Sequence, residues 1–186
     1  PQPTDYYVIL QFLIKYEVGD KSFWKLLTSN QQEHINIWLR LVSLAIFKVK
    51  GEMDFRVLNY VGNLPHVILF FVLIRRCKDY LFTIAAFAFF YFMFSYHQFI
   101  THGLASNQHF YTLAFTCIAI HFASGESWKK WLAIVFCLLA SATFGHGFLS
   151  FIACAILLLI RKEYLTSTIF IIMGLLVFFL YLQLNG

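Results

Sequence analysis

The feature that most constrains this chain is a succession of apolar runs between residues 55 and 186, separated by short polar connectors. The runs predict six helical segments, at residues 55–74, 80–96, 108–124, 130–144, 148–161 and 164–184. The whole chain is 60% hydrophobic and 12% charged, whereas soluble domains are about half apolar and about a quarter charged. A bilayer accepts such a surface when helices satisfy their own backbone hydrogen bonds. We therefore predict an all-α fold, a polytopic transmembrane helical bundle.

Two of these segments, 130–144 and 148–161, are short, because a bilayer span takes about 20 residues. They are interpreted either as tilted half-helices or as one re-entrant hairpin broken at Gly145-His146-Gly147. Within the first segment, Gly62 and Pro65 predict a kink.

Residues 1–54 form a separate unit, with six of the nine acidic residues of the chain and six Lys or Arg. Apolar residues recur at helical spacing over 5–15 and 35–47, which indicates amphipathic helices. The second of these runs contains Arg40 and falls short of the roughly 20 residues of a span. We predict an outer-face loop with interfacial helices over 1–54, followed by the bundle over 55–186.

The basic residues of the connectors predict the topology. Seven of them lie on alternate connectors, and the connectors around 97–107 and 145–147 contain none: Arg75, Arg76, Lys78, Lys129, Lys130, Arg161 and Lys162. The positive-inside rule places the basic connectors in the cytoplasm. Residues 1–54 then lie on the outer side of the membrane.

Other sequence features limit the kinds of partner that the chain can have. The net charge is +5, yet no basic patch with interleaved aromatic residues favours nucleic acid. The four cysteines lack metal-ligand or redox spacing and are expected to be small packing residues. The apolar runs predict the lipid bilayer as a partner, and protein partners stay unknown. Because the chain begins at Pro1 and ends just after an apolar run, we expect it to be a piece of a longer protein.

Polar residues of the outer face are the candidates for chemistry. On the predicted topology five of the seven histidines lie at or near that face, and two of its acids join them as candidates: Asp5, Glu33, His34, His97, His102, His109 and His146. Such a cluster suits general base catalysis, metal binding or anion recognition. The simpler interpretation is that these side chains are solvated or interfacial. His66 is different, because ionisable groups within a span are rare and often functional. The alternative interpretation is that His66 donates to the backbone carbonyl group that Pro65 leaves without a partner.

Four short motifs occur in order along the chain: Asp5-Tyr6-Tyr7, Gln32-Glu33-His34 followed by Leu39-Arg40-Leu41, the run from Ser106 to Tyr111, and Phe144-Gly145-His146-Gly147-Phe148. In this order they resemble motifs of the C-type (GT-C) polytopic membrane glycosyltransferases, specifically an uncharacterised bacterial branch. The chain departs from that pattern at Ile35, where the family has Arg, and at His146, where it has Asn. The resemblance implies that this chain is a piece of such a protein, without the family's first transmembrane span and without spans that follow residue 186.

The resemblance also implies an activity in the cell envelope, at a bacterial inner membrane with residues 1–54 on its periplasmic side. A sugar would pass from a polyprenyl-phosphate donor to an acceptor at the outer face, with Asp5 as the catalytic general base. Donor and phosphate contacts would come from Glu33, His34, Arg40, His109 and His146. A divalent metal ion is the one cofactor this chemistry could use, with Glu33 and His34 as its candidate ligands.

Two alternatives belong to other classes of protein. A non-catalytic polytopic membrane subunit or transporter component would keep the fold and lack the chemistry. A redox subunit would bind haem or quinone through His66, His109 or His121.

Overall fold

The computed structural model describes residues 3–19, 22–29, 36–76, 103–126 and 128–185. Every element in these ranges is a helix, in the order α1 (Pro3–Val18), α2 (Phe23–Leu27), α3 (Ile37–Lys50), α4 (Phe55–Arg76), α7 (Gly103–Ala123), α8 (Lys129–Thr143), the 3-10 turn η2 (Gly145–Phe148), α9 (Leu149–Ile160) and α10 (Tyr164–Asn185). The prediction of an all-α fold is confirmed for the described residues. The predicted segment 80–96 lies outside them.

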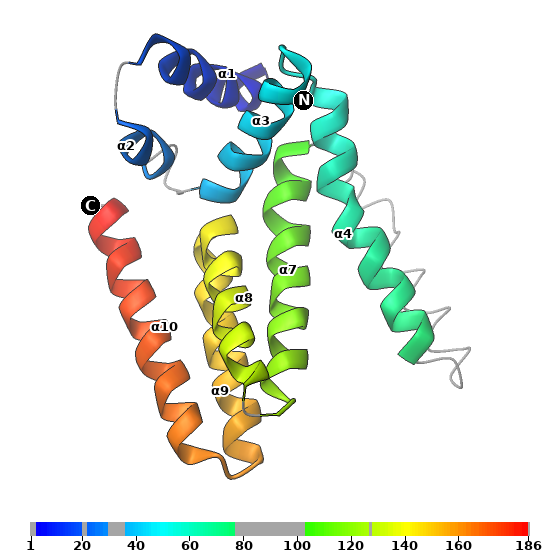
Figure 1. Ribbon diagram of the computed structural model, residues 1–186, viewed down its shortest axis with the longest axis vertical. Helices are drawn as coiled ribbons and strands as arrows, with labels where there is room; N and C mark the ends of the chain where they lie inside the picture. The colour runs from blue at the N-terminus through cyan, green and yellow to red at the C-terminus, as the bar shows by residue number, and fades with distance from the viewer. Residues whose placement is uncertain (1–2, 20–21, 30–35, 77–102, 127, 186) are drawn as a thin grey trace.

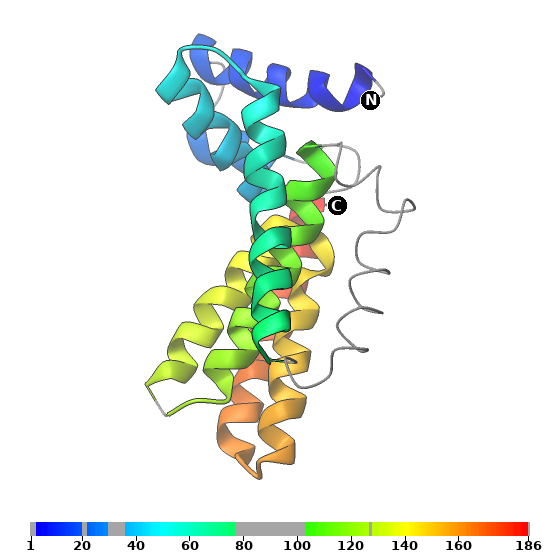
Figure 2. The same ribbon diagram turned by 90° about the vertical axis from the view of Figure 1, so that its right-hand side faces the viewer.

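The helices form two layers (Figure 1). Helices α4 and α7–α10 run roughly along the long axis, and we call them the bundle. Helices α1–α3 lie across one end of it, and we call them the N-terminal layer; in Figure 2, α1 runs nearly perpendicular to α4. We name the two ends of the bundle after their content. The layer end adjoins α1–α3, and the basic end carries the α7–α8 and α9–α10 connectors.

Small residues and a few large aromatic rings form the core of the bundle. The fully buried residues Ala119, Ala133, Cys137 and Cys154 face one another from α7, α8 and α9. Helix α10 comes close at Gly174, where an added Cβ atom would lie 2.9 Å from the Cβ atom of Phe151. Small residues at such positions allow helix backbones to approach, as is typical of helix packing in membranes.

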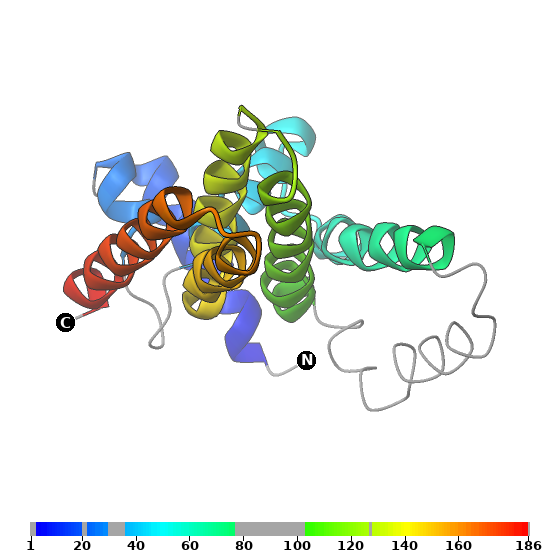
Figure 3. The ribbon, with the colours of Figure 1, turned by 90° about the horizontal axis from the view of Figure 1, so that it is seen from below.

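Helices α4 and α7 run in the same direction, and polar side chains join them near the layer end. The Asn107 side-chain amide donates to the Leu58 carbonyl oxygen over 3.0 Å, and the Tyr111 hydroxyl donates to the Val61 carbonyl oxygen over 3.1 Å. Asn107 is fully buried. Toward the basic end α4 leans away from α7, as Figures 1 and 3 show. Helix α4 continues through Pro65 as one helix.

Among the described residues, one helix is long and apolar enough to cross a membrane, the stretch Tyr164–Leu184 of α10. Its exposed face is rich in large apolar side chains, including Leu165, Ile172, Leu176 and Phe179. The apolar stretch Gly145–Ile160 is shorter. These features fit a membrane-associated protein.

The remaining differences from the predicted ranges are local. Helix α2 was not predicted, because five residues are too few to show a helical period. Helix α7 begins at Gly103. The prediction placed its start at residue 108, because the first turns of the helix contain polar residues such as Ser106 and Asn107 and therefore do not look like part of an apolar run. The break predicted at Gly145–Gly147 is present as η2.

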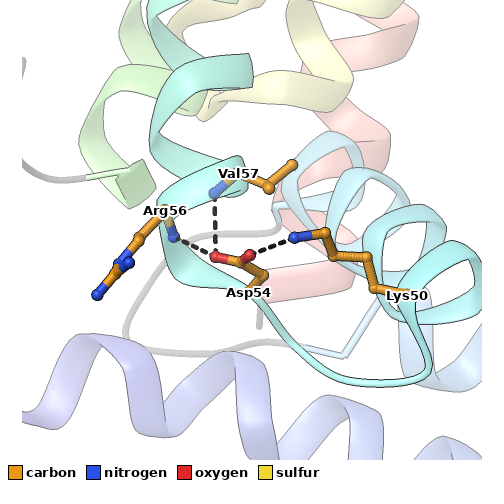
Figure 4. Close-up of polar contacts among 4 residues, drawn as sticks. All are labelled: Lys50, Asp54, Arg56 and Val57. Carbon is orange, nitrogen blue, oxygen red and sulfur yellow. Dashed lines mark hydrogen bonds and ion pairs between the residues drawn. The ribbon is translucent and has the colours of Figure 1, made fainter.

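Asp54 fixes the junction between the N-terminal layer and the bundle (Figure 4). One oxygen of its carboxylate accepts the backbone N–H groups of Arg56 (2.9 Å) and Val57 (3.3 Å), which caps the start of α4. The other oxygen pairs with the Lys50 ammonium group at the end of α3. The Lys50 contact, followed by these backbone bonds, lowers the pKa of Asp54 below its ordinary value.

We predict that Asp54→Ala lowers the thermal unfolding temperature at neutral pH. Asp54→Asn, which keeps a capping oxygen but loses the ion pair, should have a smaller effect. The folded-state pKa is depressed, so this stabilisation is complete above the unfolded value of about 3.9 and is lost as pH falls through the folded pKa. Circular dichroism melts at several pH values test this. Glu52→Gln is the matched control, and an equal effect of that change would contradict the assignment.

Candidate functional site

Three of the six predicted site residues have described side chains: Arg40, His109 and His146. Glu33 and His34 lie outside the described residues. Asp5 belongs to the first turn of α1, and only its backbone is described. This turn lies beside the start of α4, because the ring of its neighbour Tyr6 is 4.4 Å from the ring of Phe55.

The structure brings His109 and His146 to the same aromatic ring. The ring centroid of Phe144 is 5.0 Å from that of His109 on α7 and 5.1 Å from that of His146 in η2. His146 stacks on Phe144 with an interplanar angle of 27°. Both histidines are exposed. We call these three residues the histidine cluster; it lies at the layer end, where α7 begins and α8 ends.

Two glycines hold η2 in position. A Cβ atom on Gly147 would lie 2.0 Å from the Ala140 carbonyl oxygen, so only glycine permits this approach of η2 to the end of α8. A Cβ atom on Gly145 would lie 2.5 Å from the Tyr181 hydroxyl oxygen on α10. The Ser150 hydroxyl donates to the Gly147 carbonyl oxygen over 2.6 Å. The turn thus presents His146 outward while its neighbours Gly145 and Gly147 are buried.

We predict that Gly147→Ala destabilises the protein. The added methyl group would meet backbone atoms that cannot rotate away, and overpacking of this kind costs roughly 1–3 kcal/mol or more. Thermal unfolding of the variant measures the loss. Gly125→Ala is the matched control, because its methyl group would meet the Lys129 side chain at 2.9 Å and a backbone atom, the Phe122 carbonyl oxygen, only at 3.3 Å. Equal melting of wild type and Gly147→Ala would contradict the close approach.

Arg40 lies inside the N-terminal layer. It is 3% exposed, and its guanidinium donates to the carbonyl oxygens of Leu26 (2.7 Å), Leu27 and Ser29 (2.7 Å) at the end of α2. It also lies over the ring of Phe12, 5.7 Å from the centroid. Burial lowers the pKa of Arg40 to about 10, so the group stays charged at neutral pH. These contacts give Arg40 a structural role that the sequence did not indicate, and its predicted contact with phosphate stays a prediction.

We predict that Arg40→Ala releases α2 from the layer. The guanidinium of Arg40 donates to three carbonyl groups, which lose these hydrogen bonds in the variant. Each buried acceptor left without a hydrogen bond costs roughly 1–3 kcal/mol. Hydrogen exchange should rise in α2 and leave α8 and α9 protected. Arg40→Lys should restore only part of the protection, since a single ammonium group cannot reproduce the planar fork. Unchanged exchange in Arg40→Ala would show that the contacts carry little free energy.

An apolar groove with a volume of about 630 Å³ lies between α4 and α7, where the two helices diverge. Its lining runs from Leu64 and Tyr111, two residues after His109, to His121 and Ser124 at the basic end. The lining is mostly apolar and suits a hydrocarbon chain.

Other sequence-based candidates are accounted for as follows. His66 is 3% exposed, and its ring centroid is 4.3 Å from that of Phe110. His121 is exposed at the end of α7. His97 and His102 lie outside the described residues. Within the described ranges, no three His, Cys, Asp or Glu side chains gather in a way that could hold a metal ion.

Sequence reasoning missed two features that the structure shows near the site. Trp38 of α3 packs on Tyr111 and Phe115 of α7, with ring centroids 5.0 and 5.2 Å apart. Nothing in the local sequence predicts that contact. The capping role of Asp54 could have been found, because an acidic residue directly before an apolar run is a helix-start signal.

Comparisons of the chain with protein-family models, with curated proteins and with solved structures find no match.

Proposed function

We propose that this chain is part of an integral membrane glycosyltransferase-like protein of the bacterial inner membrane. In this proposal it transfers a sugar from a polyprenyl-phosphate donor to an acceptor at the membrane face next to the N-terminal layer. The observation that supports the proposal best is the histidine cluster, in which His109 and His146 flank Phe144 at the layer end. The sequence motifs supply the class of reaction.

The distribution of charge supports the proposed orientation. The Lys130–Glu163 ion pair and the bond from the Arg161 guanidinium to the Ser124 carbonyl oxygen join two connectors at the basic end. Lys and Arg favour the cytoplasmic side of membrane proteins, so this end would face the cytoplasm. The histidine cluster and residues 1–54 would then face the periplasm, where a lipid-linked sugar meets its acceptor.

In the proposed reaction Asp5 takes the proton of an acceptor hydroxyl while that oxygen attacks the anomeric carbon of the sugar. The bond from that carbon to the phosphate oxygen breaks, and the polyprenyl phosphate leaves with the bonding electrons. An imidazole N–H of His109 or His146 can donate to a phosphate oxygen and offset the growing charge. The prenyl chain would lie in the α4–α7 groove. Glu33, His34 and Arg40 remain proposed donor ligands, and no step depends on a metal ion.

One observation favours the alternative, a non-catalytic polytopic subunit or transporter component. The guanidinium of Arg40 is engaged with backbone carbonyl groups inside the N-terminal layer. A chain that kept the fold but not the chemistry would need Arg40 for this structural contact alone.

We predict that the full chain in lipid nanodiscs binds a long-chain polyprenyl phosphate more tightly than the corresponding polyprenol. The readout is the ratio of the two dissociation constants. His109→Ala and His146→Ala should each reduce that ratio about 10-fold, because a hydrogen bond to a charged group contributes roughly 1.5–3 kcal/mol. His121→Ala, at the basic end of the groove, is the matched control: it can change the affinity for the prenyl chain, which both lipids carry, and should leave the ratio unchanged.

The catalytic step has its own test. Asp5→Asn should keep the binding ratio and abolish transfer from a panel of polyprenyl-phosphate sugars to the membrane glycan. Full transfer by Asp5→Asn would exclude Asp5 as the general base. Binding without transfer by the wild-type chain would favour the non-catalytic alternative. Equal affinity of the wild-type chain for polyprenyl phosphate and polyprenol would exclude His109 and His146 as phosphate-binding residues.

A further inference from the structure

Two connectors meet at the basic end and gather charge there. Between Glu126 and Glu163 they carry four cationic residues against two acids: Lys129, Lys130, Arg161 and Lys162 against Glu126 and Glu163. Lys130 pairs with Glu163, and Lys129 lies 3.8 Å from Glu126. The excess positive charge therefore resides in the α9–α10 turn, where Arg161 and Lys162 are both exposed.

The backbone of that turn favours glycine but carries a lysine. Lys162 has a φ of +62°, and within the described residues it is the one non-glycine residue with positive φ. Its N–H donates to the Leu159 carbonyl oxygen, and the N–H of Glu163 donates to that of Leu158, each over 2.9 Å. This is the Schellman ending of a helix, whose left-handed position is usually glycine because a side chain there is strained. The fold thus tolerates strain at a site that holds an exposed ammonium group.

Exposed aromatic residues surround the charges. Trp128 and Trp131 of the α8 start are 61% and 65% exposed, and Tyr164 at the start of α10 is 64% exposed. Tryptophan and tyrosine with an apolar body and a polar edge prefer the boundary between lipid headgroups and hydrocarbon. Directly beyond them the exposed faces become apolar, with Val135 on α8 and Leu165 on α10. Nucleic acid or an acidic soluble protein would not explain this sequence of charge, aromatic ring and apolar side chain along the helices.

We propose that the basic end is a recognition surface for anionic lipid headgroups, with Arg161 and Lys162 contacting the headgroup and Trp128, Trp131 and Tyr164 lying at the interface. The inference depends on the membrane insertion in the proposed function but not on glycosyl transfer. The proposal explains why a lysine occupies the strained position 162, because a glycine there would lack the positive charge that an anionic headgroup attracts.

The test uses the full chain in nanodiscs of zwitterionic phosphatidylcholine with added brominated phosphatidylglycerol or brominated phosphatidylcholine. Trp24→Phe and Trp38→Phe leave Trp128 and Trp131 as the fluorescent reporters at the basic end. Quenching then gives the ratio of association constants for anionic and zwitterionic lipid. Thermal unfolding is measured on the same samples.

We expect the reporter protein to prefer the anionic lipid. Arg161→Gln and Lys162→Gln should each reduce the preference about 5-fold, since a cation near an anionic surface contributes about that factor. Lys162→Gly should reduce it equally but raise the unfolding temperature, because glycine relieves the left-handed strain. Lys15→Gln, at an exposed position of the N-terminal layer, is the control and should leave both readouts unchanged.

Several outcomes would overturn the assignment. They are equal quenching by both lipids, an unchanged preference in Lys162→Gln, and loss of the preference in inorganic phosphate but not in chloride at matched ionic strength. The last would indicate a site for free phosphate. In each case retention of the chain in the nanodisc would leave the proposed membrane insertion standing.

Discussion

The hydrogen bond from Asn107 on α7 to the Leu58 carbonyl oxygen on α4 links two helices of the bundle at the residue where α4 also packs into the N-terminal layer. Leu58 is fully buried in the core of the N-terminal layer, together with Phe12, Leu27 and Leu39. Its carbonyl oxygen accepts the bond from Asn107, in the first turns of α7. A buried amide is costly unless it finds a partner, so this bond sets the register of α4 against α7. Because the Leu58 side chain packs among residues of α1, α2 and α3, the same residue of α4 contacts both the N-terminal layer and α7.

The two ends of the bundle that result are chemically different. At the layer end, glycines and a close-packed 3-10 turn bring two histidines to one phenylalanine ring. At the basic end, the connectors hold ion pairs and exposed tryptophan residues. A helical bundle with unlike ends suits an asymmetric solvent such as a bilayer between two aqueous compartments.

The sequence predicted those features that depend on local pattern. Apolar runs located the long helices, and the pair Gly145 and Gly147 located the break between α8 and α9, because both signals lie within a few residues. The structural role of Arg40 was not predictable, since its carbonyl partners on α2 lie in another helix and carry no side-chain signature. The meeting of His109 with His146 around Phe144 also depends on the packing of α7 against η2. The roles assigned to Asp5, Glu33 and His34 stay predictions.

The lengths of the helices have a consequence for the surrounding lipid. Helix α10 has 22 residues, which is about 33 Å at 1.5 Å per residue, whereas α8 with 15 residues spans about 22 Å and α9 with 12 about 18 Å. In the proposed membrane setting the hydrocarbon is about 30 Å thick, so the α8–α9 side is mismatched and the α10 side is not. A bilayer relieves such a difference by thinning locally. Thinning beside η2 would draw the headgroup plane inward toward His146 and shorten the path of a long-chain lipid's polar group to that side chain.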